Sequence, residues 1–386
     1  MKEKIIIGFS KLIIFREILK TKTIKKLIKL LKYNSNDEAE TTYLYYNFLN
    51  ELYNYNDNIG DFLLEYIFRD NNIYIKKLLL KQTINKNIEN ALKEELDFFS
   101  YLSEINFSDI YNNLAELETK KIDFYSIYST HIKEINKKGY GIFYNSNMFT
   151  LDEKNNITKA KHQDNQNIKQ LYGYDREREK VIQNTKILLE GKKANNILLY
   201  GDAGTGKSST IKAVANMFRD EGLRLIEVKK SQLSLIPDII QKLSLSPLKF
   251  IIFIDDLTFS YNDDSFSYLK AVLEGGVNSF PQNIVVYVTS NYRHLIKENF
   301  NDRTGDDIHV EDTIQQIMSL TNRFGIVITF QRPDRDLFID IVLSYAKDNN
   351  IQINKEELIK QAESYAIRSA GRSPRVAKQF IESISL

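Results

Sequence analysis

The chain is predicted to be an α/β protein, in which a parallel sheet lies between helices, with an all-helical domain before it and a small helical module after it. Three observations predict this class. In the second half, apolar β-rich runs alternate with helical segments, which is typical of a parallel sheet covered on both faces. Helical apolar spacing recurs through the first 135 residues, which contain no proline. From Arg335 onward the helical spacing returns.

The composition is that of an ordinary globular protein. The chain has 386 residues, of which 42% are hydrophobic and 27% charged, and this length suggests two or three domains. A net charge of +2 gives no global attraction to nucleic acid or to an anionic membrane. The absence of cysteine excludes disulfides, thiolate zinc ligands and a thiol nucleophile. The four histidines lack ligand spacing, so no metal cluster is expected from His131, His162, His294 and His309.

The first twenty residues contain apolar runs that Lys11 and Arg16 interrupt, and no small-residue cleavage site follows them. A buried amphipathic helix is therefore predicted there, and not a signal peptide. No stretch of the chain reaches the ~20 apolar residues that a membrane span needs. We expect no membrane association and a cytoplasmic location.

Residues 1–135 are predicted to form the helical domain. Asp61, after Gly60, is a predicted helix N-cap. The aromatic residues of this domain are interleaved with lysines, which suggests base stacking, but rings at helical spacing favour a core position. The clearest helical repeats are Tyr45, Phe48, Leu49 and Leu52; Phe62, Leu63, Tyr66 and Ile67; and Ala91, Leu92, Leu96 and Phe99.

Residues 136–170 break this pattern. Gly139, Gly141 and the polar run 152–167 predict an extended linker. A charged amphipathic helix is predicted over 175–189, and Gly191 leads from it into the next strand.

The sequence GDAGTGKS at 201–208 fits the phosphate-loop pattern G-x-x-x-x-G-K-S/T at every position. An apolar strand over 196–200 precedes it and an amphipathic helix over 209–219 follows, a context that favours a nucleotide site over an ordinary glycine-rich turn. Glycines let backbone N–H groups point at a phosphate, and the helix N-terminus adds its dipole. Lys207 is predicted to reach the β- and γ-phosphates, and Ser208 to ligate Mg²⁺. The predicted phosphate contacts are Gly201, Asp202, Ala203, Gly204, Thr205, Gly206, Lys207, Ser208 and Ser209.

Two further apolar strands end in polar residues. The run 250–254 leads into Asp255 and Asp256, and the run 284–290 leads into Asn291. Ligands bind at the carboxyl ends of parallel strands, so these side chains are expected beside the phosphate loop. Asp255 is predicted to hold Mg²⁺, Asp256 to polarise the attacking water, and Asn291 to contact the γ-phosphate or orient that water. Each strand end, taken alone, also fits an ordinary turn.

Two arginine-containing segments follow, SLTNRF at 319–324 and GRSPR at 371–375. An arginine beside the γ-phosphate stabilises the charge of the transition state. An ordinary surface charge is the alternative for either segment.

The order of these motifs resembles that of AAA+ ATPases, with two Walker motifs, sensor 1, an arginine finger and sensor 2. More narrowly, five phrases resemble a bacterial AAA+ group known as domain-of-unknown-function family 815. The resemblance covers about residues 140–386. The five phrases are NNILLYG at 195–201, IDDLTF at 254–259, LEGGV at 273–277, TSNYRHL at 289–295 and LTNRFG at 320–325.

The resemblance implies a P-loop AAA+ core over residues 171–332, a helical lid over 333–386, and ATP with Mg²⁺ as ligands. It implies that Arg323 acts in trans on a neighbouring subunit's nucleotide, and hence a homo-oligomer. Arg375 would be sensor 2, with Arg372 as the alternative. Adenine would be contacted by Tyr172 and Gly173.

One departure bears on activity, because many AAA+ enzymes carry Asp-Glu where this chain has Asp255 and Asp256. The Asp256 side chain is one methylene shorter than glutamate, and Glu274 is a candidate to assist it. Hydrolysis of ATP to remodel or regulate an unknown protein partner, bound through the N-terminal domain, is the leading prediction. A low-turnover switch or loader and a DNA-associated replication or repair ATPase stay open, although the net charge does not support DNA binding. The lack of an aromatic pore loop between 228 and 250 argues against a peptide-threading unfoldase, and the lack of N-K-x-D argues against a GTPase.

Overall fold

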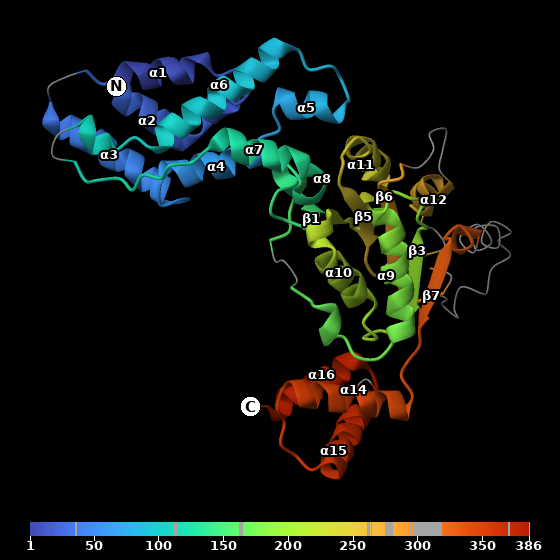
Figure 1. Cartoon of the computed structure of the whole chain (residues 1–386). Coiled ribbons are helices and arrows are strands. Elements are labelled where there is room, and N and C mark those ends of the chain that lie inside the picture. Colours follow the sequence, from blue (N-terminus) through green and yellow to red (C-terminus); the bar gives the residue numbers. More distant parts are fainter. Residues whose placement is uncertain are drawn as a thin grey trace. The chain divides into compact units, whose positions relative to one another are not determined.

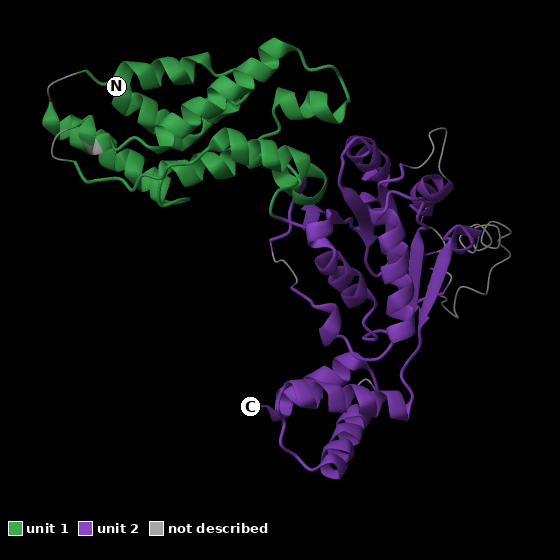
Figure 2. Cartoon of the chain, in the orientation of Figure 1, with its two compact units in different colours: residues 1–145 green, residues 146–386 purple. Residues whose placement is uncertain are grey.

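The computed structural model describes residues 1–34, 37–111, 114–161, 165–260, 263, 265–274, 281–293, 295, 319–369 and 371–385. The chain divides into two compact units, Met1–Asn145 and Ser146–Leu386 (Figure 2). Three of the four histidines, His162, His294 and His309, lie outside the described residues, as does most of the LEGGV phrase. Within the described ranges, no group of three or more acidic or histidine side chains is placed to hold a metal ion. No helix of the described part is long and apolar enough to span a membrane.

The first unit is helical, as predicted (Figure 1). Its first helix buries Ile5 and Phe9, as expected of an amphipathic helix in a core. Polar side chains cap most of the helices, and Asn58 caps the fourth by accepting the Asp61 N–H at 2.8 Å. The predicted cap at Asp61 was wrong because the helix already includes Gly60. The helices are α1 (Lys2–Lys11), α2 (Lys22–Lys32), α3 (Glu38–Tyr53), α4 (Ile59–Arg69), α5 (Ile73–Leu79), α6 (Lys86–Ser103), α7 (Phe124–Lys133) and α8 (Ile135–Lys138).

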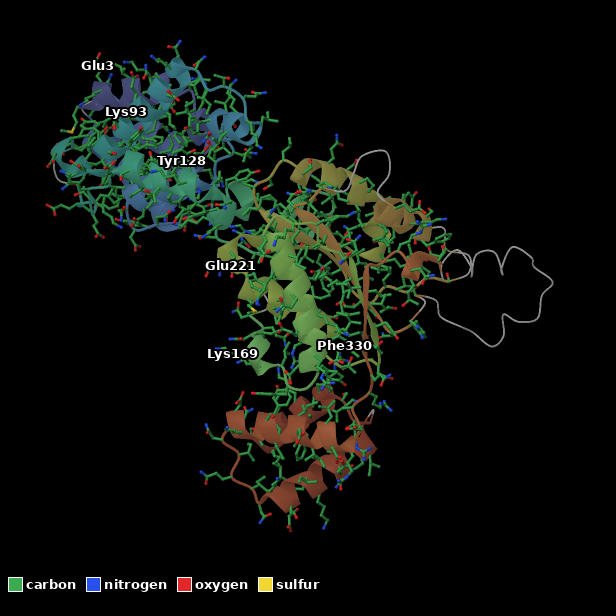
Figure 3. All side chains as sticks on the ribbon, turned by 45° about the vertical axis from the view of Figure 1, so that its right-hand side comes forward. Glu3, Lys93, Tyr128, Lys169, Glu221 and Phe330 are labelled. Carbon is green, nitrogen blue, oxygen red and sulfur yellow. The ribbon has the colours of Figure 1, made fainter. Side chains whose placement is uncertain are left out.

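Many of the aromatic side chains of this unit form its core. Tyr45, Phe48 and Phe99, which were predicted from their helical spacing, are fully buried. Tyr128, labelled in Figure 3 among the helices, is 1% exposed and packs edge-on against Phe15. Helical spacing therefore identified three fully buried rings, whereas the other two predicted rings, Phe62 and Tyr66, are partly buried and pack against the core.

His131 of α7 lies in the same core and is 2% exposed. Its ring packs on Phe68, with centroids 4.4 Å apart, and on Tyr144. Neither ring nitrogen has a hydrogen-bond partner among the described residues. Burial in these apolar surroundings lowers the pKa of His131 to about 4.

Replacing His131 with phenylalanine is expected to stabilise the helical unit by about 1 kcal/mol at neutral pH, because two unpaired buried nitrogens are removed. The gain should grow as the pH falls. In the unfolded chain His131 has its ordinary pKa of 6.5 and is protonated at pH 4.5. In the folded chain its pKa is about 4, so it stays mostly neutral, and wild type loses stability as the pH falls. At pH 4.5 the variant should therefore gain roughly 2–3 kcal/mol more. Hydrogen exchange of the α7 segment in a urea series, at pH 7 and pH 4.5, measures both.

Burial raises the pKa of Asp70 to about 6, so this group binds its proton more readily in the folded chain and stabilises the fold as the pH falls. That effect is present in wild type and variant alike, so it cancels in their difference. A difference that is the same at both pH values would show that His131 takes up its proton in the folded state.

The second unit contains a seven-stranded sheet with the order β2-β1-β4-β5-β6-β3-β7. All neighbouring strands are parallel except β1 and β2. All residues of β6 are buried, so both faces of the sheet are covered at its centre. The strands are β1 (Met148–Leu151), β2 (Ile157–Lys159), β3 (Ile197–Gly201), β4 (Leu223–Glu227), β5 (Lys249–Ile254), β6 (Ile284–Ser290) and β7 (Ile326–Phe330).

The linker predicted over 136–170 is corrected by this sheet. β1 pairs in parallel with β4, where Met148 lies opposite Leu225, and β2 pairs with β1. The division between the units falls at Asn145 and Ser146, not at residue 135. Strands of four and three residues are too short to show alternation, and the polar turn between them has a linker's composition.

Helices cover the sheet and form the C-terminal module. Val181 and Leu188, with Ile211 and Val214, share one apolar core with the strands. The last three helices pack on a core of their own that includes Phe338 and Phe380. The helices of this unit are α9 (Asp175–Leu189), α10 (Lys207–Met217), α11 (Ile236–Leu243), α12 (Phe266–Glu274), α14 (Arg335–Asp348), α15 (Lys355–Arg368) and α16 (Pro374–Ile384) (Figure 1).

Candidate nucleotide site

The loop 202–206 connects β3, which lies between β6 and β7 in the sheet, to α10. Gly201, Gly204 and Gly206 have φ angles of 136°, 79° and 94°, all in the region that favours glycine. At Gly201 a Cβ atom would come within 2.0 Å of the carbonyl oxygen of Phe330, so no side chain fits there. Because α10 begins at Lys207, the N–H groups of its first turn have no partner within the helix and open toward the loop. This arrangement is an anion-binding helix N-terminus.

The side chain of Lys207 is held inside this loop, and the residue is only 6% exposed. Its ammonium donates to the carbonyl oxygens of Gly201 and Asp202, at 2.7 and 2.8 Å, and to Oδ1 of Asn291 at 3.1 Å. Burial lowers the pKa of Lys207, and the nearby carboxylate of Asp256 is the strongest of the charges that oppose this shift. Lys207 is thus a buried cation with partners that phosphate oxygens could replace.

A hydroxyl and a carboxylate meet at the start of α10. Ser208 Oγ donates to Oδ1 of Asp255 at 2.5 Å, and Thr289 Oγ1 donates to the same oxygen at 2.6 Å. Asp255 follows β5 and Thr289 lies near the end of β6, so three neighbouring elements supply these oxygens. Hydroxyl and carboxylate oxygens are the ligands that Mg²⁺ prefers. The predicted metal ligands Ser208 and Asp255 therefore lie together and fit that ion.

Asp256 is held in an uncommon backbone conformation, with a φ of 48°. Its N–H donates to Thr289 Oγ1 at 2.9 Å, and its Oδ1 accepts from the amide of Asn291 at 2.6 Å. Asn291 contacts Lys207 with its other amide atom. The Asn291 side chain thus bridges the buried cation and the carboxylate predicted to act on water.

Most of the predicted site residues line one pocket of about 490 Å³. Several other residues that line the pocket were not predicted, because they belong to no recognisable motif. Gln166 and Leu171 precede α9, and the lid helices supply Tyr345 and Lys378. The predicted residues among the lining are Ala203, Gly204, Gly206, Lys207, Ser208, Ser209, Asp255, Asp256, Asn291 and Arg375.

Three other residues predicted to contact phosphate shape the loop without lining the pocket. Gly201 supplies the close approach to β7 described above. Thr205 is 2% exposed, and its hydroxyl donates to the carbonyl oxygen of Asp202 at 2.8 Å. The carboxylate of Asp202 accepts the N–H of Arg332 at 3.0 Å. The loop is thereby tied to the segment that leads into the lid.

The two residues predicted to contact adenine are not among the described residues that line the pocket. The Tyr172 ring packs edge-on against Tyr345, with centroids 4.7 Å apart, and its hydroxyl donates to Asp348. Gly173 lies so close to Ile341 that a Cβ atom would come within 2.9 Å of that side chain. Tyr172 therefore supports Tyr345, which lines both this pocket and an adjoining one of about 330 Å³.

The three arginines take different positions. Arg375 lines the pocket, and its N–H donates to the carbonyl oxygen of Gly204 at 3.2 Å, so the start of α16 rests on the phosphate loop. Arg372 instead pairs with Glu363 at 2.7 Å. Arg323 pairs with Glu274 at 2.6 Å, and neither residue is among the described residues that line the pocket.

The class of protein is defined by a mostly parallel sheet in which the phosphate loop follows β3, the acidic residues follow β5, the strand β6 lies between these two, and a three-helix lid follows. It is a P-loop nucleotide-binding fold of the AAA+ type. A family model described as a protein of unknown function, DUF815, matches residues 144–385. The chain belongs to this family.

Solved structures of the Thermotoga maritima RuvB Holliday junction branch migration motor resemble part of the chain. One is 13% identical with a TM-score of 0.40, and it matches over 56% of this chain and 63% of that one. Two substituted forms are each 15% identical, with TM-scores of 0.39 and 0.36, and they cover 56% and 53% of this chain and 63% and 61% of theirs. The chain spans about 63% of the length of the first of these structures, and a likeness of this size says nothing of activity. No curated protein matches the chain.

Proposed function

We propose that the chain binds ATP with Mg²⁺ and hydrolyses it. The observation that carries this proposal is the convergence of Lys207, Ser208 and Asp255 on one pocket at the carboxyl ends of β3 and β5. Ser208 and Asp255 would hold the metal ion, which would supply positive charge at the phosphate oxygens. A nucleoside triphosphate is the ligand that needs a helix N-terminus, a buried cation and a divalent metal together.

The residues of the pocket divide the chemistry between them. Lys207 exchanges the carbonyl oxygens of Gly201 and Asp202 for phosphate oxygens, a stronger charge-assisted pairing. Asp256 accepts a proton from the attacking water, and Asn291 orients that carboxylate. Arg375 reaches the phosphates from the lid, so the lid senses whether nucleotide is bound.

We propose further that the active form is a homo-oligomer in which Arg323 contacts a neighbouring subunit's nucleotide. Two observations support this. The Arg323 side chain is about a third exposed, and its partner within the chain is Glu274 rather than a residue of the pocket. An arginine delivered across an interface stabilises transition-state charge only when the assembly forms. The protein partner expected at the N-terminal unit, which the ATP cycle would remodel, stays a prediction.

A low-turnover, ATP-dependent switch is the second candidate function. It is favoured by the 2.6 Å contact between the Asp256 carboxylate and the Asn291 amide, which takes up part of the hydrogen-bonding capacity of the group that would act on water. ATP binding without measurable phosphate release by the assembled wild type would select this function. Steady-state release would select hydrolysis.

Asp256→Asn is expected to keep Mg²⁺-ATP binding and to lower phosphate release by roughly 10²–10⁴-fold, because it removes a general base. Asparagine adopts the left-handed backbone of this position readily and still accepts a hydrogen bond from Asn291. The fold and the pocket should therefore survive the change. Equilibrium binding of a fluorescent ATP analogue and a phosphate-release assay measure the two effects separately. Unchanged release by the variant would remove Asp256 from the mechanism.

A further inference from the structure

Positive charge is concentrated at the start of the helical unit. Residues 2–32 carry ten lysines and arginines against two glutamates, although the whole chain has a net charge of only +2. Most of this charge lies on α1 and α2. The net charge of the whole chain is therefore near zero although this segment is strongly basic, and the segment can attract a polyanion locally.

The lysines of α2 form a stripe along its exposed side. Lys22, Lys25, Lys29 and Lys32 follow one another at intervals of three and four residues and are all exposed. The buried side of the same helix carries Ile24, Leu27, Leu30 and Leu31. Within the described part of the chain, none of the four ammonium groups has an ion pair, whereas Lys26 pairs with Glu51 at 2.8 Å. The stripe is thus four adjacent cations facing solvent.

The tyrosines of α3 form a second stripe. Tyr43, Tyr46 and Tyr53 share one helix face and are 61%, 48% and 52% exposed, and Tyr55, just past the helix, is 65% exposed. The opposite face carries the core residues Tyr45, Phe48 and Leu52. Many other rings of this unit are buried in its core, but these four remain in solvent. Exposed rings of this kind are available for stacking.

The two stripes lie side by side on the same side of the unit. α2 and α3 pack against each other (Figure 1). The Lys26–Glu51 ion pair joins the flanks by which they meet. The chain reverses between the two helices, so this pair brings Lys25 level with Tyr53 and Lys32 level with Tyr46. On each helix the stripe is opposite the buried face and therefore points outward. We name the combined surface of these four lysines and four tyrosines the Lys–Tyr face.

We propose that the Lys–Tyr face binds single-stranded nucleic acid. The lysines would pair with phosphates along the strand, and the tyrosine rings would stack on bases beside them, which is how sequence-tolerant single-strand sites are built. Stacking on exposed rings requires unpaired bases, so a duplex is not the occupant. Ammonium groups and rings do not read the sugar, so DNA and RNA strands should bind alike. This surface belongs to the helical unit and does not depend on the nucleotide site.

The same charges would also attract an anionic membrane, but the rest of the face does not fit one. Membrane-surface helices insert Leu, Phe or Trp side chains beside their lysines. On the described residues of α2 and α3, the exposed large hydrophobic side chains are all tyrosines. Burial of Leu27, Leu30 and Leu31 in the protein core leaves α2 no apolar side to insert. A nucleic acid strand is therefore the occupant that matches both stripes.

Fluorescence anisotropy of the full chain with a labelled oligothymidylate of about 20 nucleotides tests the proposal, over a range of about 50 to 200 mM salt. We expect at least tenfold tighter binding than to a duplex of equal length. Removing two charges with Lys25→Gln and Lys29→Gln should reduce the slope of log affinity against log salt by about 1.4, or 0.7 per phosphate. Tyr43→Ala with Tyr53→Ala should weaken binding at least tenfold and leave that slope unchanged.

The matched control is Lys86→Gln with Lys121→Gln, which removes the same charge from exposed lysines elsewhere in the unit and should change affinity less than twofold. A Lys207→Ala chain should bind the oligonucleotide as wild type does, so failure of the nucleotide site would be distinguished from failure of this proposal. Circular dichroism confirms that each variant is folded. The proposal is overturned if the oligothymidylate does not bind, if duplex, RNA alone or anionic vesicles bind in its place, or if the control pair is equally impaired.

Discussion

Alanine at Lys207 is expected to abolish ATP hydrolysis and to weaken ATP binding. Lys207 is the buried cation at the base of the pocket, and nothing else on α10 can replace its charge at the phosphates. Loss of a preorganised electrostatic group at the transferred phosphate costs roughly 10³-fold or more in turnover. Steady-state phosphate release and calorimetric titration with Mg²⁺-ATP measure the two losses.

Lys212 provides a matched control on the same helix. Its ammonium lies 3.7 Å from Glu227, away from the residues that line the pocket. Lys212→Ala should keep turnover within a fewfold of wild type. The Lys207→Ala chain should unfold at no lower temperature than wild type without nucleotide, because it loses a desolvated charge. Hydrolysis that survives in Lys207→Ala would contradict the proposed mechanism.

Alanine at Arg323 is expected to lower turnover by roughly 10³–10⁵-fold, the range measured for arginine fingers, with ATP affinity unchanged. ATP affinity should not change because Arg323 pairs with Glu274 and does not line the pocket of its own chain. Arg372→Ala is the control, because that arginine pairs with Glu363 within the lid. It should retain near-wild-type turnover.

Mixing two inactive chains tests whether the finger acts between subunits. Lys207→Ala subunits lack a working pocket but keep Arg323, whereas Arg323→Ala subunits keep the pocket. Mixed assemblies should therefore regain phosphate release at interfaces where an intact pocket meets an intact finger. Light scattering before and after mixing shows that the assembly has formed. Assembled mixtures that stay inactive would exclude action in trans.

The phosphate loop was predictable from the sequence because everything that shapes it is local. Its glycines, Lys207 and Ser208 lie within eight consecutive residues, and the strand and helix on either side are strongly apolar on one face. Asp255 and Asn291 were predicted by one further rule, that parallel strands end at the same edge of the sheet. The structure brings both next to Lys207 and Ser208.

Contacts between distant segments were not predictable in the same way. The choice between Arg372 and Arg375 depends on Glu363, which pairs with the first and leaves the second at the pocket. Tyr345 was not predicted at the pocket, because a tyrosine in an amphipathic helix carries no signal of its function, and adenine contact by Tyr172 stays a prediction. β1 and β2 were missed because such short strands depend on a partner strand for their conformation.

The sequence by itself therefore determined the class of fold, the phosphate loop and the acidic strand ends, because each rests on periodicity or on spacing within one segment. Only the tertiary structure decided which arginine reaches the pocket, that Asn291 joins Lys207 to Asp256, and which tyrosines of the helical unit remain in solvent. Helical spacing assigns a residue to a face, and whether that face is buried depends on what packs against it. The Lys–Tyr face is the clearest case, since its rings follow the same spacing as the core.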